Sequence, residues 1–338
     1  ARLGFRNEPG SEHDHRDADR NIDEEDRAPS PTEQIPGHQE SAEDRSQHGG
    51  QSRDRAVDAE DRAVAQDIRP LEIAIVNLMP TKIATETQML RLLSNSPLQV
   101  NITLLRTEAH ESKNTPAQHL ERFYKTFSEI RHGSFDGMIV TGAPVEHLPF
   151  EDVDYWHELL DIMTFAQSRV YSTLYICWAA QAALYHFYGI PKYTLPAKVS
   201  GVFDHEILQP GCRLFRGFDD SFTAPHSRHT EVRANDLAKH SGLRILAESP
   251  EAGLALAESL DHSQVFMTGH LEYDRGTLDA EFRRDQERGM NPIPPSHYYP
   301  DNDPANQPRP GRRRDAGKVG KAEPRLAHGF LDDEVQHF

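Results

Sequence analysis

The chain has 338 residues, with 54 acidic against 37 basic side chains and a formal charge of −17. We expect no nucleic-acid partner, because that needs clustered Lys and Arg, and no membrane span, because no apolar run approaches ~18 residues. Two cysteines, Cys177 and Cys212, are too few for a disulfide framework and favour a reducing, cytoplasmic setting. The 19 histidines show no zinc-binding spacing, so we expect no metal site.

The acidic charge is concentrated in the first 68 residues. They hold 18 acidic and 9 basic side chains and a single aromatic residue, Phe5. Such a segment cannot bury enough apolar surface to offset its chain entropy. We therefore expect residues 1–68 to be an acidic disordered tail.

From residue 71 onward, short apolar runs alternate with segments of helical periodicity. The predicted strands are 71–78, 99–106, 136–141 and 171–176, and the predicted helices are 81–94, 115–130, 151–168 and 178–188. Thr115 and Gln118 form a predicted capping box, with Pro116 as the first helical residue. This alternation predicts an α/β fold with a parallel sheet flanked by helices.

The pattern is looser after Pro191. Short apolar runs occur at 199–203, 243–247, 253–257 and 264–268, and a final helix is predicted at 274–288. Residues 291–310 contain seven prolines, which indicates an irregular segment. Residues 311–338 are basic at first and only weakly apolar.

Cys177 lies where a predicted strand meets a predicted helix. An alanine-rich helix follows it directly. This layout is typical of a nucleophile elbow, in which a sharp turn lifts one side chain above the sheet. A helix N-terminus also favours a thiolate. The alternative is a structural cysteine in the core, which is how we interpret Cys212.

His270 and Glu272 follow the apolar run 264–268 and Gly269. A thiol nucleophile needs a base, and the base needs a group that holds its tautomer. Side chains two residues apart on an extended segment share one face, so Glu272 is placed to orient His270. A surface histidine beside a solvated glutamate is the alternative. Gly142, in the loop after 136–141, is either an ordinary turn residue or a backbone donor at the same sheet edge.

Six blocks of the sequence resemble the homoserine O-acyltransferase family. They are RPLEIAIVNLMPTKIATETQ (69–88), TGAP (141–144), CWAAQA (177–182), PHSR (225–228), GHLEYD (269–274) and HYYPDND (297–303). The resemblance implies an α/β fold similar to class I glutamine amidotransferases, with a nucleophile elbow at Cys177. It also implies a cytoplasmic, homodimeric enzyme of methionine biosynthesis.

The resemblance assigns roles to individual residues. Cys177 matches the acyl-thioester nucleophile, His270 the general base and Glu272 the residue that orients the base. The other matches are the substrate-binding residues Lys198, Ser227 and Arg284 and the near-site residue Lys82. Backbone N–H groups near Trp178 and Gly142 are expected to stabilise the oxyanion.

Glu146 bears on the acyl donor. The family divides between succinyl and acetyl transfer, and the position after Thr-Gly-Ala-Pro-Val discriminates between them. A glutamate there fills the space for the succinyl arm and repels its carboxylate. We therefore expect acetyl transfer from acetyl-CoA to L-homoserine, with no bound cofactor.

Other functions stay open from the sequence. Within the same class, the alternatives are succinyl-CoA as donor or serine as acceptor. From other classes, the alternatives are a cysteine-dependent amidohydrolase, in which Cys177, His270 and Glu272 would hydrolyse an amide, and an inactive homologue. The expected organisation is a tail at 1–68, the acyltransferase domain at 69–310 and an atypical, disordered C-terminal segment at 311–338.

Overall fold

The structure is a computed structural model that describes residues 69–110 and 114–306. The predicted tail at 1–68 and the C-terminal segment at 311–338 lie outside the described residues. The strands are β1 (Leu71–Val76), β2 (Val100–Leu105), β3 (Tyr124–Lys125), β4 (Phe135–Val140), β5 (Val170–Ile176), β6 (Tyr193–Ile207), β7 (Ser221–Glu231), β8 (Leu243–Ser249), β9 (Gly253–Ser259) and β10 (Gln264–Met267). The helices are α3 (Lys82–Leu93), α4 (Ala117–Phe123), α5 (Phe127–Ile130), α6 (Trp156–Arg169), α7 (Trp178–Tyr188), α8 (Ala234–Leu237) and α9 (Thr277–Glu287).

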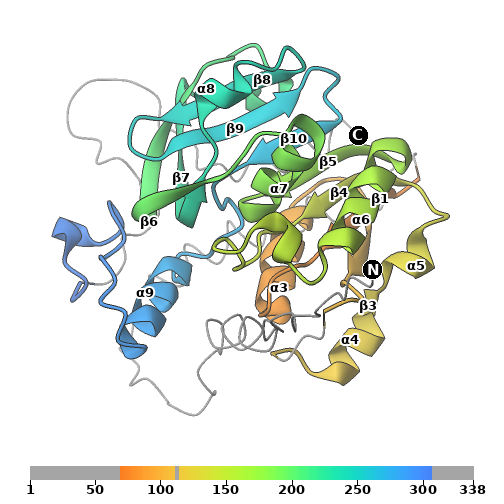
Figure 1. The fold of residues 1–338 in the computed structure, drawn as a ribbon, viewed down its shortest axis with the longest axis horizontal. Coiled ribbons are helices and arrows are strands. Elements are labelled where there is room, and N and C mark those ends of the chain that lie inside the picture. The colour runs from red at the N-terminus through yellow and green to blue at the C-terminus, as the bar shows by residue number, and fades with distance from the viewer. Residues whose placement is uncertain (1–68, 111–113, 307–338) are drawn as a thin grey trace, which may run out of the picture.

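All of these strands form one mixed sheet in the order β3-β2-β1-β4-β5-β10-β9-β8-β6-β7 (Figure 1). Neighbours from β3 to β10 in this order pair in parallel, which confirms the α/β class. In the other half, where the sequence pattern is looser, β10, β9, β8, β6 and β7 pair antiparallel. Antiparallel neighbours need no crossover helix, and this is why the helical alternation stops after α7.

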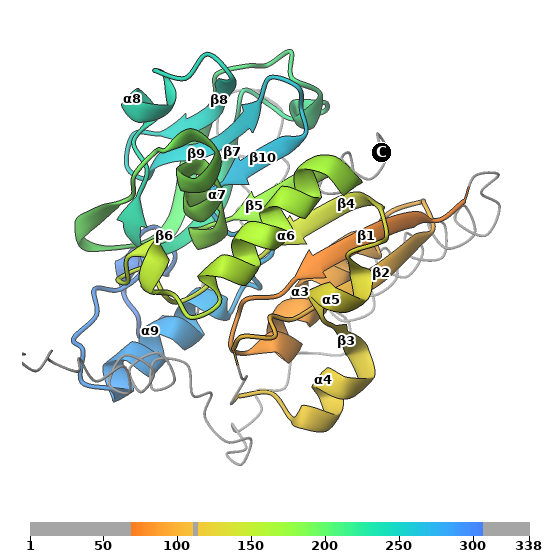
Figure 2. The same cartoon turned by 45° about the vertical axis from the view of Figure 1, so that its right-hand side comes forward.

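Helices cover both faces of the parallel half, so the core has two layers. Ala74 and Val76 of β1 face a cluster that includes α6 and α7, which lie side by side in Figure 2. Ile73 and Ile75 face the opposite cluster, together with Met89 of α3. Alternate residues of one buried strand therefore supply both core layers.

The helix predicted at 115–130 is interrupted. Pro116 precedes α4 as its N-cap instead of forming its first turn, and the capping box is at Thr126 and Glu129, where α5 begins. Between the two helices, Tyr124 pairs with β2. Its buried hydroxyl donates to Glu86 and accepts from Asn77. These tertiary bonds outweigh the local helical preference.

Two further elements differ from the prediction. α6 begins at Trp156 instead of residue 151, after a 3-10 turn at Phe150–Asp152. The sequence does not predict β7, because its polar residues and Pro225 argue against a strand. β7 is the edge of the sheet, where a proline costs no ladder bond.

Candidate active site

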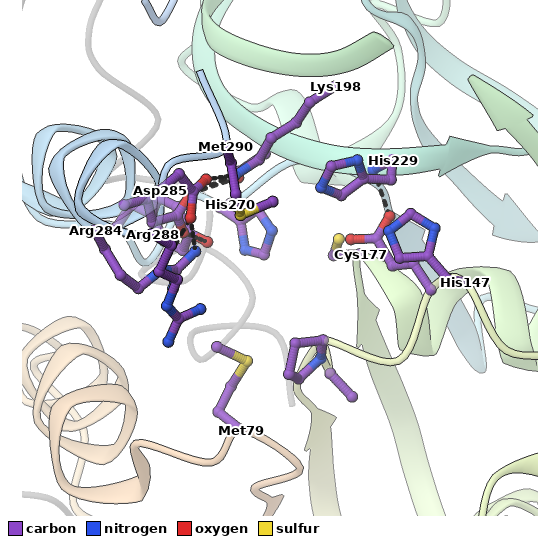
Figure 3. A pocket seen from close by; sticks show the side chains of 17 residues that line it. Met79, His147, Cys177, Lys198, His229, His270, Arg284, Asp285, Arg288 and Met290 are labelled. Atoms are coloured by element: carbon purple, nitrogen blue, oxygen red, sulfur yellow. Dashed lines mark hydrogen bonds and ion pairs between the residues drawn. The ribbon is translucent and has the colours of Figure 1, made fainter. Parts of the chain in front are cut away.

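The carboxyl ends of the parallel strands open into one pocket, which β6, β7 and α9 complete from the side (Figure 3). Cys177 follows β5, Gly142 follows β4 and His270 follows β10. In this view Cys177, His147 and His229 lie on one side of the pocket, and side chains from α9 lie on the other. The sheet thus gathers residues that are far apart in the sequence, as open α/β sheets do at this edge.

Cys177 has a backbone conformation that few non-glycine residues adopt, with φ 50° and ψ −113°. It lies between β5 and α7, and its N–H donates to Met267 O at 2.7 Å. This strained turn is the predicted elbow, and it places the thiol at the N-terminus of α7. A Cβ at Gly142 would lie 3.3 Å from Cys177 Cβ and 3.6 Å from His270 Cε1, so only a glycine fits comfortably between them.

His270 is buried and forms a hydrogen bond with one of its two expected partners, because its Nδ1 is 2.7 Å from Glu272 Oε1. The other expected partner, Cys177, lines the same pocket. Burial lowers the pKa of His270, but the negative charges of Glu272 and Cys177 and the hydrogen bond to Glu272 hold that pKa well above 6.5. The imidazolium form is therefore favoured beside a Cys177 thiolate.

Glu146 lines the pocket and is bonded to the edge strand. Its Oε2 accepts from the N–H of His229 at 2.5 Å and from the N–H and hydroxyl of Thr230 at 3.0 and 3.2 Å. Burial raises the pKa of Glu146, while these bonds act in the opposite direction. The carboxyl group of Glu146 therefore already accepts the hydrogen bonds that His229 and Thr230 can donate on the Cys177 side of the pocket.

The α9 side of the pocket is rich in charge. Lys198 Nζ lies 3.1 Å from Asp285 Oδ2, and Arg284 donates to Asp285 Oδ1 at 2.9 Å. Ser227 Oγ donates to Glu281 Oε2 at 2.5 Å. Lys198, Ser227 and Arg284, which are distant in sequence, thus line one part of the pocket.

Three of the residues singled out from the sequence, Glu272, Lys82 and Trp178, do not line the pocket. Glu272 is bonded to His270, which does line it. Lys82 is buried, and its Nζ donates to Asn77 O at 2.6 Å and Met79 O at 3.3 Å. Desolvation lowers the pKa of Lys82 to about 8. It stabilises the turn that carries Met79, a pocket residue. Trp178 is fully buried among the aromatic rings of the α6 and α7 layer.

The sequence reasoning missed several residues at the site. Tyr273 stacks on the His270 ring with centroids 4.2 Å apart, and its place in the GHLEYD block was a signal. Glu281 and Asp285 share the face of α9 that carries Arg284, as the helical repeat would have indicated. Arg228 is 2% exposed, and the charges of Cys177 and Glu146 oppose the lowering of its pKa by burial.

Metal clusters and membrane-spanning helices are both absent from the described residues. Within 69–110 and 114–306, no group of three or more His, Cys, Asp or Glu side chains is arranged to hold a metal ion. Over the same residues, no helix is both long and apolar enough to cross a membrane.

Known proteins resemble the chain over most of its length. The family model described as "HTS: Homoserine O-succinyltransferase" matches residues 50–319. A homoserine O-acetyltransferase of Desulfovibrio desulfuricans is 81% identical over 247 residues, which are 73% of this chain and 79% of the relative. A homoserine O-acetyltransferase of Thermotoga neapolitana is 58% identical over 246 residues, 73% of this chain and 81% of the relative.

Solved structures with a related outline share little sequence. A glutamine amidotransferase of Thermotoga maritima matches with a TM-score of 0.48 and 10% identity, covering 66% of this chain and 85% of that one. A glutamine amidotransferase of Methylobacillus flagellatus matches with a TM-score of 0.45 and 13% identity, covering 80% of this chain and 92% of that one.

Proposed function

Because the chain belongs to the homoserine O-succinyltransferase family and is therefore a homoserine acyltransferase, we propose that it uses acetyl-CoA and carries the acetyl group on Cys177. The observation that carries the proposal is the buried array of Cys177, His270 and Glu272 at the carboxyl edge of the sheet. The relatives named homoserine O-acetyltransferase support the choice of donor. The product would be O-acetyl-L-homoserine, within methionine biosynthesis.

The first half-reaction acylates the thiol. The Cys177 thiolate attacks the thioester carbonyl, and the backbone N–H groups near Gly142 and Trp178 stabilise the oxyanion. As the tetrahedral intermediate collapses, the bond to the coenzyme A sulfur breaks. The leaving thiolate takes the proton of the His270 imidazolium. This step leaves an acetyl-cysteine beside a neutral imidazole.

The second half-reaction uses the same histidine as a base. Acetylation removes the thiolate charge, which is one of the causes that raise the pKa of His270. The neutral imidazole accepts the proton of the homoserine hydroxyl as the oxygen attacks the acetyl carbon. The C–S bond then breaks and restores the thiolate beside the imidazolium, held in position by Glu272. Ping-pong kinetics follow.

Glu146 supports acetyl rather than succinyl as the transferred group. Its Oε2 already takes donors from His229 and Thr230, so a succinyl carboxylate at this end would lose its water without gaining those bonds. When Glu146 is ionised, the two carboxylates would also repel each other. An acetyl group brings no charge to this end of the pocket.

Intact-mass measurement tests the donor and the nucleophile together. Incubation with acetyl-CoA alone should add one acetyl group to the protein, and succinyl-CoA alone should add little. The variant Cys177→Ala should show no adduct and no transfer to homoserine, because no other thiol faces His270. Cys212→Ala is the matched control and should behave as the unchanged chain. A stable acetyl adduct or full turnover in Cys177→Ala would contradict the proposal.

The cellular setting is part of the proposal. Cys177 and Cys212 are both free, which suits a reducing cytoplasm. A homodimer is proposed from the resemblance alone, and light scattering on the purified chain would measure it.

A further inference from the structure

The loop that joins β4 to the 3-10 turn at Phe150–Asp152 carries Glu146, the residue that bears on the acyl donor. The Glu146 side chain is attached to β7, because its Oε2 accepts from the N–H groups of His229 and Thr230. Such bonds weaken steeply once the distance grows by about 0.5 Å. The position of this carboxylate therefore depends on whether the main chain of the loop is also held.

The main chain of this loop is held by the side chain of Lys192. Lys192 Nζ donates to Glu146 O at 2.6 Å and to Leu148 O at 2.5 Å. The same Nζ lies over the ring of Phe150, 4.5 Å from its centroid. An ammonium group has three N–H donors and no acceptor. The two carbonyl groups and the ring therefore satisfy it together, and they all belong to one loop.

Lys192 is half-buried and directly precedes β6. Burial lowers the pKa of Lys192 to about 8, while the negative charges of Glu146 and Glu151 act in the opposite direction. The ammonium form therefore predominates at pH 7. β6 pairs with β7, and Thr194 lies opposite Thr230 in this pairing. The backbone anchor and the side-chain anchor of Glu146 thus come from the same end of two paired strands.

The other end of the loop has a separate anchor. Thr141 N–H donates to Val76 O at 3.0 Å, next to Gly142 of the proposed oxyanion site. The bonds of Lys192 are made at the far end of the loop. Loss of these bonds should therefore release the far end and leave the acylation of Cys177 intact.

We propose that Lys192 is a positioning residue that holds Glu146 on β7 and thereby maintains the preference for acetyl over succinyl. This inference rests on the proposed function, in which Glu146 excludes the succinyl carboxylate. Without the ammonium group, two carbonyl groups lose their donor, and the loop moves toward water to satisfy them. Glu146 then leaves the N–H groups of β7, which become free to bind a succinyl carboxylate. An acetyl group has no carboxylate to place there, so its transfer does not depend on Lys192.

Donor discrimination is the first measurement. Acetyl-CoA and succinyl-CoA are supplied separately with homoserine at pH 7, and kcat/KM is obtained for each donor. Lys192→Met keeps an unbranched side chain but removes the donors. The ratio of the acetyl to the succinyl value should fall by about tenfold or more, as expected for lost bonds to a charged group. The fall should come from a faster succinyl reaction, with the acetyl value changed by less than about threefold.

A double-mutant cycle separates positioning from a general loss of structure. Glu146→Gly removes the discriminating carboxylate, so Lys192→Met should have no further effect on the ratio in that background. Lys125→Met, at an exposed lysine of β3, is the matched control and should leave the ratio unchanged. An unchanged ratio in Lys192→Met, or equal falls in the two backgrounds, would overturn the inference.

Amide hydrogen exchange gives a second readout that needs no acyl donor. The N–H groups of His229 and Thr230 donate to Glu146, so they should exchange about tenfold faster or more in Lys192→Met. The N–H of Thr141, at the separately anchored end, should not change. If the unchanged chain takes succinyl-CoA as readily as acetyl-CoA, the proposed donor is wrong, and faster exchange would still support the positioning of Glu146 by Lys192. Unchanged exchange at both amides would overturn that positioning, whichever donor is used.

Discussion

At the scale of the residue, the site depends on strain and charge held within a buried environment. Cys177 has a φ of 50°, and His270 and Glu272 are each about 95% buried. One oxygen of the glutamate, Oε2, is buried without a hydrogen-bond partner within the described part of the chain. The negative charge of Glu272 therefore acts mainly on the His270 imidazole, with which it forms its hydrogen bond.

Replacing Glu272 by glutamine should weaken that imidazole as a base. An amide keeps the shape but removes a charge that raises the pKa of His270, so the pKa of His270 should fall. The value of kcat/KM should decrease by about 10²- to 10⁴-fold, as when a triad carboxylate becomes neutral. An NMR titration of the histidine ring and steady-state kinetics measure the two effects.

The matched control is Glu287→Gln, which should leave both quantities unchanged. An unaltered pKa of His270 in Glu272→Gln would mean that the 2.7 Å contact does not set the protonation of the base.

At the scale of the element, the segment after α9 is attached to β6 by backbone bonds. Val202 N–H donates to Ser296 O at 2.9 Å, and Ser296 N–H donates to Ser200 O at 2.8 Å. Tyr298 and Tyr299 pack under α9 in a small separate cluster. The proline-rich sequence predicts an irregular segment. It does not predict that this segment is bonded to β6, because β6 lies far away along the chain.

The variant Gly201→Ala should detach this segment. Gly201 has φ +154°, and an added Cβ would overlap Ser296 O and lie 2.8 Å from Ser296 N. We expect a loss of about 3 kcal/mol in the free energy of unfolding, from strain and overpacking together. Homoserine binding should weaken as α9 moves, while acetylation of Cys177 persists. Urea unfolding and intact mass measure these effects.

Gly211→Ala provides the comparison, because no atom lies within 4 Å of its Cβ position. That variant should lose less than about 1 kcal/mol. An equally small loss in the free energy of unfolding of Gly201→Ala would show that the close approach of residue 201 to Ser296 does not require a glycine.

At the scale of the whole molecule, stability depends on how buried groups titrate. His205 and His226 are fully buried and joined by an Nε2–Nε2 hydrogen bond of 2.9 Å. Burial lowers the pKa of His205 to about 4 and that of His226 well below 6.5. Both histidines therefore remain neutral in the folded chain at pH values where the unfolded chain takes up protons.

The resulting pH dependence has a definite sign. At these two histidines the unfolded chain binds more protons than the folded chain below about pH 6.5, so their contribution to the free energy of unfolding falls as the pH decreases toward about 4. His205 alone should contribute a loss of about 2 kcal/mol between pH 7 and pH 5. His205→Gln retains a donor for His226 without titrating, and its loss over this interval should be smaller by that amount.

Urea unfolding at the two pH values provides the measurement. His132→Gln, at an exposed histidine, should show the same pH dependence as the unchanged chain. An identical loss in His205→Gln and the unchanged chain would contradict the assignment of this acid sensitivity to the buried pair.

The sequence predicted the features that depend on local pattern. Continuous apolar runs identify the buried parallel strands such as β1 and β5, and the strand-to-helix junction identifies the turn at Cys177. His270 and Glu272 are two residues apart, so their pairing also follows from local geometry. The motif blocks supplied the family, which the comparisons confirm.

The remaining features require long-range contacts that no local period encodes. β7 alternates polar residues whose partners lie on other elements, as when Ser227 meets Glu281 across 54 positions, so its sequence does not have the pattern of a buried strand. Tyr124 interrupts a predicted helix because Asn77 and Glu86 satisfy its hydroxyl. Such polar bonds form only where the fold brings both partners out of water, and this is why the bonds of Lys198 and Ser227 to α9 could be found only in the tertiary structure.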